Sequence, residues 1–141
     1  MLLEFNYEEI TALSSGARDY LQLRRDREGS AVAAPPAAVG FVEELLPRLE
    51  GTIPVRTLGD QRRIEGAVEA VLLHLRAQME RWILVTHPAG EEAVAAYFDF
   101  AHVRVVLERI REMGREMRAL FELMTGEPAV GPRAMAYVFP E

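Results

Sequence analysis

The chain has 141 residues, of which 50% are apolar and 27% charged, and this balance is typical of one globular domain covering residues 1–141. Its net charge of −6 disfavours binding to nucleic acids and anionic membranes, and the absence of cysteine excludes disulfides and thiolate chemistry. No apolar run approaches the ~20 residues of a membrane span, and no basic segment opens the chain as in a signal peptide, so we expect a soluble cytoplasmic protein without membrane partners.

The first helix is predicted to begin after Asn6. Asn6 is a favourable N-cap, and Glu9, three residues later, completes the pattern of a capping box. Phe5 and Ile10 occupy the two positions of a hydrophobic staple. Apolar residues then recur at helical spacing, and Gly29 is the predicted end of the helix.

A second, interrupted helix is expected from about Pro36 to Glu50. Its apolar spacing continues through Pro47, which removes a backbone hydrogen bond, so we expect a kink or a break there. The segment Thr52–Leu58 is short, β-branched and contains a proline. We interpret it as an extended strap packed over helices and not as an edge strand, because the sequence offers no obvious partner strand.

The last two helices are predicted to form an antiparallel hairpin. The third begins near Asp60, or near Thr57 with Asp60 at its third position, and ends at about Thr86. The fourth runs without proline from Glu91 to Met124, about 50 Å at 1.5 Å per residue. The connection between them is short enough to force antiparallel neighbours. The first half of the long helix, residues 93–107, is apolar nearly all round, which predicts burial on every side.

The late part of the long helix is expected to extend past its partner, because Gln61 falls opposite Glu116 when the hairpin is paired outward from its turn. Gly114 lies within the apolar stripe there and indicates a close helix crossing. The chain itself, a second copy or another protein must cover this stripe. The irregular tail, residues 126–141, is expected to be ordered and to dock on its own bundle or on a neighbouring subunit. The predicted partner interface consists of Ile110, Met113, Gly114, Met117, Leu120, Phe121 and Met124.

Arg81 and His87 are the candidate catalytic residues. With five residues between them, they resemble the Arg-x4–6-His signature of HEPN ribonucleases, which are small all-helical dimers. The resemblance covers seven residues, and Trp82 stands where family members usually carry a polar residue. It implies that Arg81 would hold a phosphate and that His87 would act as a general acid or base.

Asp99 and His102 lie three residues apart on the long helix and therefore share one face. Metal sites in helical bundles need further carboxylate and histidine ligands, and the sequence has no second copy of this motif. We expect a buried polar pair here, with no metal and no cofactor.

The sequence as a whole predicts an all-α antiparallel bundle of about four helices with one long C-terminal helix. We expect a non-catalytic interaction or assembly protein, most simply a homodimer joined through the late part of that helix. Two alternatives are a HEPN-like ribonuclease of toxin or defence type and a bundle that encloses a small apolar ligand near Tyr97, Phe98 and Phe100.

Overall fold

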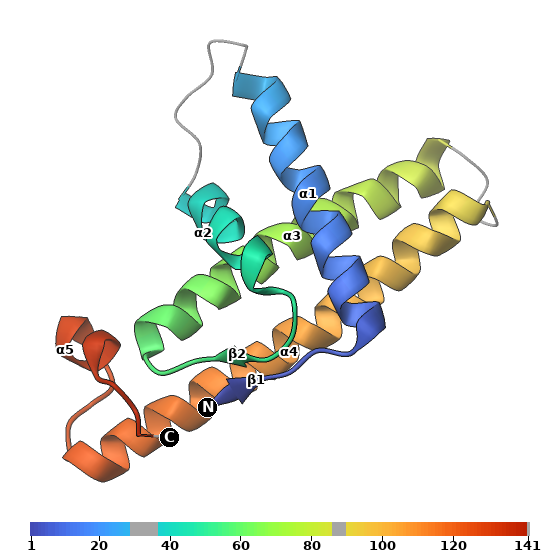
Figure 1. The fold of residues 1–141 in the computed structure, drawn as a ribbon. Helices are drawn as coiled ribbons and strands as arrows, with labels where there is room; N and C mark the ends of the chain where they lie inside the picture. Colours follow the sequence, from blue (N-terminus) through green and yellow to red (C-terminus); the bar gives the residue numbers. More distant parts are fainter. Residues whose placement is uncertain (29–36, 86–89, 141) are drawn as a thin grey trace.

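A computed structural model describes residues 1–28, 37–85 and 90–140, and the predicted all-helical bundle is confirmed. Helices α3 and α4 lie side by side and antiparallel, α1 crosses both of them, and α2 packs on α3 (Figure 1). Both chain ends lie near the late part of α4 (Figure 1). In chain order the elements are β1 (Leu2–Leu3), α1 (Tyr7–Glu28), α2 (Ala37–Leu45), the 3₁₀ turn η1 (Leu46–Arg48), β2 (Ile53–Pro54), α3 (Leu58–Val85), α4 (Glu91–Thr125) and α5 (Gly131–Ala136).

The start of α1 has the predicted capping box. The backbone N–H of Glu9 donates to Asn6 Oδ1 at 2.8 Å, and the N–H of Asn6 donates to Glu9 Oε1 at 2.9 Å. The Glu9 carboxylate is buried and also accepts from both terminal nitrogens of the Arg109 guanidinium, at 3.0 and 2.9 Å. The cap of α1 is therefore tied directly to the middle of α4.

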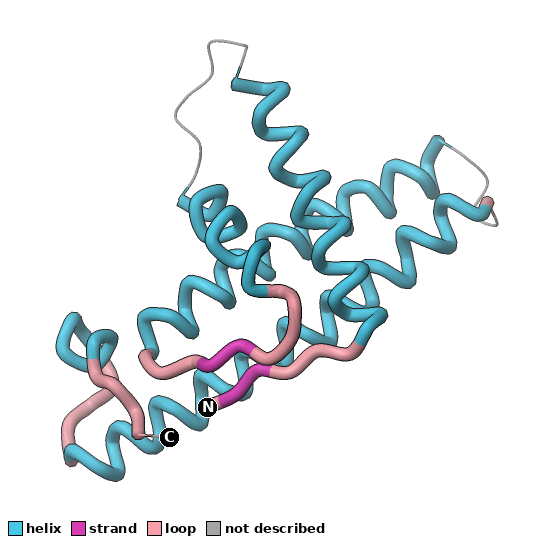
Figure 2. The backbone as a smooth tube through the Cα atoms, viewed as in Figure 1, coloured by secondary structure: helices cyan, strands magenta, loops and turns pink. Residues whose placement is uncertain are grey.

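The connection between α2 and α3 corrects one prediction. The break at Pro47 is confirmed, because α2 ends at Leu45 and the chain continues as the 3₁₀ turn η1. The following segment, however, contains β2, which pairs antiparallel with β1 and places Ile53 opposite Leu3 (Figure 2). The prediction of a strap without a partner strand was wrong. The partner strand β1 lies at the beginning of the chain and has only two residues, so it is too short to show the alternating pattern by which strands are recognised in a sequence.

The α3–α4 hairpin makes a tight contact where Gln61 meets Gly114. Helix α3 begins at Leu58, and the N–H of Asp60 donates to Thr57 Oγ1 at 3.0 Å, in agreement with the earlier of the two predicted starts. The Gln61 side chain is fully buried and donates to the carbonyl of Ile110 at 2.9 Å. A Cβ on Gly114 would lie 2.5 Å from Gln61 Nε2. The close neighbour of Gly114 is therefore a buried side-chain amide of α3, and the close crossing of two helix backbones stays a prediction.

The tail docks on its own bundle, which was one of the two predicted outcomes. Helix α5 packs against α3, and the N–H of Phe139 donates to the carbonyl of Arg56 at 2.8 Å. The Tyr137 ring meets the rings of Phe121 and Phe139 edge-on, with centroids 5.3 and 5.0 Å apart. The chain therefore covers the late part of α4 with residues that follow it in the sequence.

The first half of α4 is not buried all round, contrary to the prediction. Val103 and Leu107 belong to the core, but Tyr97 and Phe98 are more than half exposed. Past the crossing with α1, the end of the α3–α4 hairpin projects from the bundle, and among the described elements only α3 lies beside α4 there (Figure 1). Among the described residues, no helix is long and apolar enough to cross a membrane.

Candidate functional site

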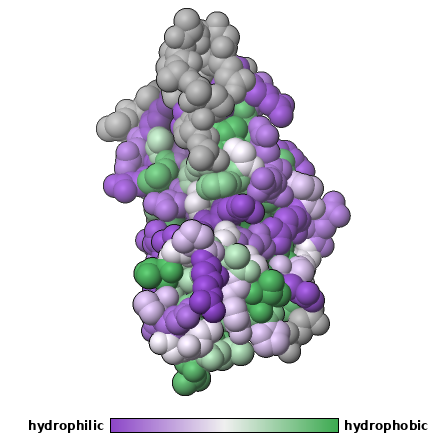
Figure 3. Space-filling view, turned by 90° about the vertical axis from the view of Figure 1, so that its left-hand side faces the viewer, coloured by the Kyte–Doolittle hydropathy of each residue, from purple (hydrophilic) through white to green (hydrophobic). Residues whose placement is uncertain are grey.

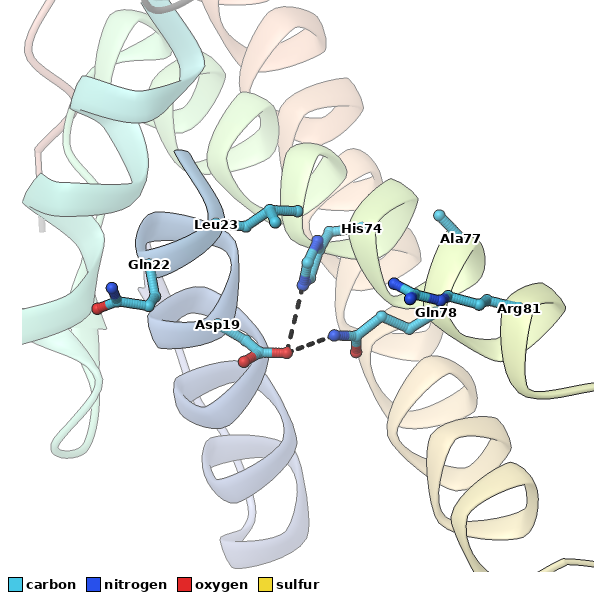
Figure 4. Close-up of a pocket in the computed structure, with 7 residues that line it drawn as sticks. All are labelled: Asp19, Gln22, Leu23, His74, Ala77, Gln78 and Arg81. Carbon is cyan, nitrogen blue, oxygen red and sulfur yellow. Dashed lines mark hydrogen bonds and ion pairs between the residues drawn. The ribbon is translucent and has the colours of Figure 1, made fainter. Parts of the chain in front are cut away.

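A cleft of about 310 Å³ opens between α1 and α3, and we call it the α1–α3 cleft. Asp19 reaches into it from α1, while His74, Gln78 and Arg81 project from successive turns of α3 (Figure 4). His74 Nε2 lies 3.5 Å from Asp19 Oδ2, and the Gln78 amide donates to the same oxygen. The remaining lining residues are Gln22, Leu23 and Ala77.

The contacts in the α1–α3 cleft join two helices. The His74 side chain is only 9% exposed, and its ring meets the Tyr20 ring edge-on at 5.9 Å between centroids. A carboxylate that orients an imidazole is found in catalytic triads, where the imidazole in turn activates a hydroxyl or thiol nucleophile. The described lining residues include no serine, threonine or cysteine. His74 lies at the edge of the α1–α3 contact and has Asp19 as a polar partner.

The structure describes only one residue of the predicted catalytic pair, Arg81. Arg81 is exposed at the edge of the α1–α3 cleft, on the same face of α3 as His74. His87 lies outside the described residues. The ribonuclease alternative consequently rests on the same sequence resemblance as before.

Asp99 and His102 do not form the predicted buried pair. Both side chains are half-buried, and in the part of the chain that the structure describes no hydrogen bond joins them. His102 Nδ1 instead lies 2.8 Å from the carbonyl oxygen of Phe98, one turn earlier. Burial raises the pKa of Asp99 above its ordinary value, and the nearby His102 counteracts part of this shift. Within the described residues no group of three or more histidine, aspartate or glutamate side chains could hold a metal ion.

The predicted partner interface is largely covered by the chain itself. Five of its seven residues are buried in the single chain, namely Ile110, Met113, Gly114, Met117 and Phe121, whereas Leu120 and Met124 are exposed. On the face toward the α5 end of the molecule, apolar residues form separate spots between hydrophilic ones (Figure 3). A partner could reach the five buried residues only by displacing the tail, α3 or the N-terminal segment.

An exposed apolar surface of α4 lies in its first half. Val94, Tyr97, Phe98 and Val105 are 43%, 52%, 55% and 53% exposed. Together with Ala101 they follow the spacing i, i+3, i+4, i+7 and i+11, which places them on one face of the helix. We call this the α4 outer face.

Sequence reasoning missed the α4 outer face because the opposite face is apolar as well. The buried residues Ala93, Val103 and Leu107 form the inner side of the same helix segment. The sequence of a helix with two apolar faces is the same whether one face or both faces are buried. Which of its faces are buried depends on how many other elements pack against the helix. The regular spacing of the exposed residues was the available signal.

Acidic side chains lie at both ends of the α4 outer face, and arginines lie beside it and beyond its end. Glu91 is exposed at its beginning, and Glu108 near its end pairs with Arg111 at 3.2 Å. Arg104 is the only arginine between residues 91 and 108, and its guanidinium lies 5.7 Å from the centroid of the Phe100 ring. Arg109, one turn beyond Val105, keeps a 40% exposed side chain despite its ion pair with Glu9.

We compared the chain with models of protein families, with curated proteins and with solved structures, and none of them matches it.

Proposed function

We propose that the protein is a non-catalytic helical interaction module that binds another polypeptide through the α4 outer face. The observation that supports this proposal is the row of four large apolar side chains, each about half exposed, on a helix whose other side is already packed. Half-exposed aromatic and valine side chains leave roughly 330 Å² of apolar surface in contact with water. Its burial at ~25 cal/mol per Å² is worth roughly 8 kcal/mol before the entropic cost of association.

The side chains on and around the α4 outer face favour a protein partner. Aromatic residues are enriched in the centres of protein–protein interfaces, and Tyr97 and Phe98 lie in the middle of this face with ring centroids 5.9 Å apart. A nucleic acid would require a basic surface, but Glu91 and Glu108 stand at the two ends. Residence in the cytoplasm stays a prediction.

Site-specific photo-crosslinking in cells tests the proposal. Phe98 is replaced by a photoreactive phenylalanine analogue, and Leu123, which is 81% exposed elsewhere on α4, carries the same analogue as a matched control. We expect a discrete crosslinked polypeptide from position 98, and we expect Tyr97→Ser to weaken it. Equal crosslinking from positions 98 and 123, or none from either, would overturn the proposal.

An RNA cleavage assay separates this function from the ribonuclease alternative. A non-catalytic module should leave single-stranded RNA intact, and Arg81→Ala and His87→Ala should change nothing. Cleavage that both substitutions abolish would establish the ribonuclease instead. The two substitutions lie outside the α4 outer face, so the same variants should still crosslink through position 98.

A further inference from the structure

We infer that the partner at the α4 outer face is a second copy of this chain, bound with the two α4 helices antiparallel. This inference rests on the proposed function and names the partner of the same surface. A two-fold axis near residues 99–100 would place position i of one copy opposite position 199−i or 200−i of the other. Val94 of each copy then lies beside Val105 of the other, and Phe98 beside Ala101. The row of apolar residues is thus complementary to itself in the reversed direction, as an isologous interface requires.

The charges at the two ends of the face also favour the antiparallel direction. Glu91 and Arg109 are eighteen residues apart and therefore lie on the same side of the helix after five full turns of 3.6 residues. In an antiparallel pair with positions adding to 199 or 200, Glu91 of one copy lies level with Glu108 and Arg109 of the other, and Arg109 is on its side of the helix. Arg109 keeps its ion pair with Glu9, and the 40% exposed part of its side chain is within reach of Glu91. In a parallel pair Glu91 would face Glu91. The nearby Glu108 already has Arg111 as a partner at 3.2 Å.

The available area fits a weak dimer. Two copies would bury at most roughly 660 Å² of apolar surface, and homodimer interfaces are about 65% apolar, which gives a total of about 1,000 Å². This value is at the minimum for a biological interface and is typical of weak, transient ones. We therefore expect a reversible dimer whose population depends on concentration.

Cysteine crosslinking tests the geometry without background, because the chain contains no cysteine of its own. Val94→Cys and Val105→Cys proteins, one of them enlarged by a tag, are mixed and mildly oxidised. The antiparallel dimer predicts a disulfide-linked product that contains one chain of each kind, and far less product from Val94→Cys alone. Leu123→Cys serves as the matched control for random collisions, since its side chain is 81% exposed.

Three results would overturn the inference. Self-crosslinking of Val94→Cys that exceeds its crosslinking to Val105→Cys would show a parallel pair, and yields equal to the Leu123→Cys control would show no specific pair. A wild-type chain that light scattering finds monomeric at millimolar concentration would exclude the second copy. In that case a crosslink from position 98 to a different polypeptide would keep the proposed function, whereas no crosslink at all would remove both. For wild type, we expect dimer mass at high concentration and a shift to monomer in Phe98→Ser.

Discussion

Replacing Gly114 by alanine should destabilise the fold, although alanine is the better helix former. In an exposed helix interior this substitution gains about 1 kcal/mol. At Gly114 the new Cβ would lie 2.5 Å from Gln61 Nε2 and 2.8 Å from its Cδ. Gln61 is fully buried, so its amide cannot move into solvent. It must leave the carbonyl of Ile110 and the carboxylate of Glu65, to which it donates at 2.9 and 3.0 Å.

The expected magnitude follows from these competing terms. Overpacking a buried site costs about 1–3 kcal/mol, and leaving a buried amide without its acceptors costs about 1–3 kcal/mol more. After subtraction of the helix-propensity gain, the free energy of unfolding should fall by about 1–5 kcal/mol. Urea denaturation followed by circular dichroism at 222 nm measures this change.

Two further variants make the Gly114 prediction decisive. Gly40 lies inside α2, and a Cβ added to it would meet no atom of the described residues within 4 Å, so Gly40→Ala should stabilise the protein by up to about 1 kcal/mol. In a Gln61→Ala background, Gly114→Ala should lose most of its cost, because the colliding amide is gone. The reasoning is refuted if Gly114→Ala stabilises the protein as Gly40→Ala does, or if its cost is the same in both backgrounds.

Glu9→Gln should lower the free energy of unfolding by about 1–3 kcal/mol at pH 7. Burial raises the pKa of the Glu9 carboxyl, but its hydrogen bonds from Arg109 and from the Asn6 backbone, together with the positive charge of Arg109, outweigh burial and hold that pKa below the ordinary value of 4.5. Because the pKa of Glu9 is lower in the folded state, its ionised carboxylate stabilises the protein at every pH above the unfolded-state pKa. This stabilisation is lost as the pH falls through the folded-state pKa. The difference in unfolding free energy between Glu9→Gln and wild type, measured by urea titration, should therefore shrink in acid. Asp99→Asn should have the opposite sign, because the raised pKa of Asp99 makes its charged form unfavourable at neutral pH; a loss of stability in the same assay would contradict this. Phe139→Ala should cost about 3 kcal/mol and expose the tail to limited proteolysis, whereas an unchanged cleavage pattern would argue against its docking.

The features that sequence predicted well depend on neighbouring residues. The capping box of Asn6 and Glu9 spans four positions, and the break at Pro47 follows from the chemistry of one residue. The antiparallel hairpin follows from the short connection between α3 and α4. In each case the physical cause lies within a few residues along the chain.

The features that sequence missed depend on distant residues or on how many neighbours a surface has. Leu3 and Ile53 pair across fifty positions through strands of two residues each, and the buried amide of Gln61 explains Gly114 only once the two helices are aligned. The exposure of Tyr97 and Phe98 depends on where α1 crosses the hairpin. A periodic pattern says which residues share a face but does not say what covers that face.

The position of the tail after α4 in the sequence has a consequence for shortened chains. Phe121 has an aromatic neighbour only if Tyr137 is present, and the backbone contact with Arg56 needs Phe139. A chain that ended at Thr125 would therefore expose the last turns of α4 to water, and chaperones bind such apolar helix ends.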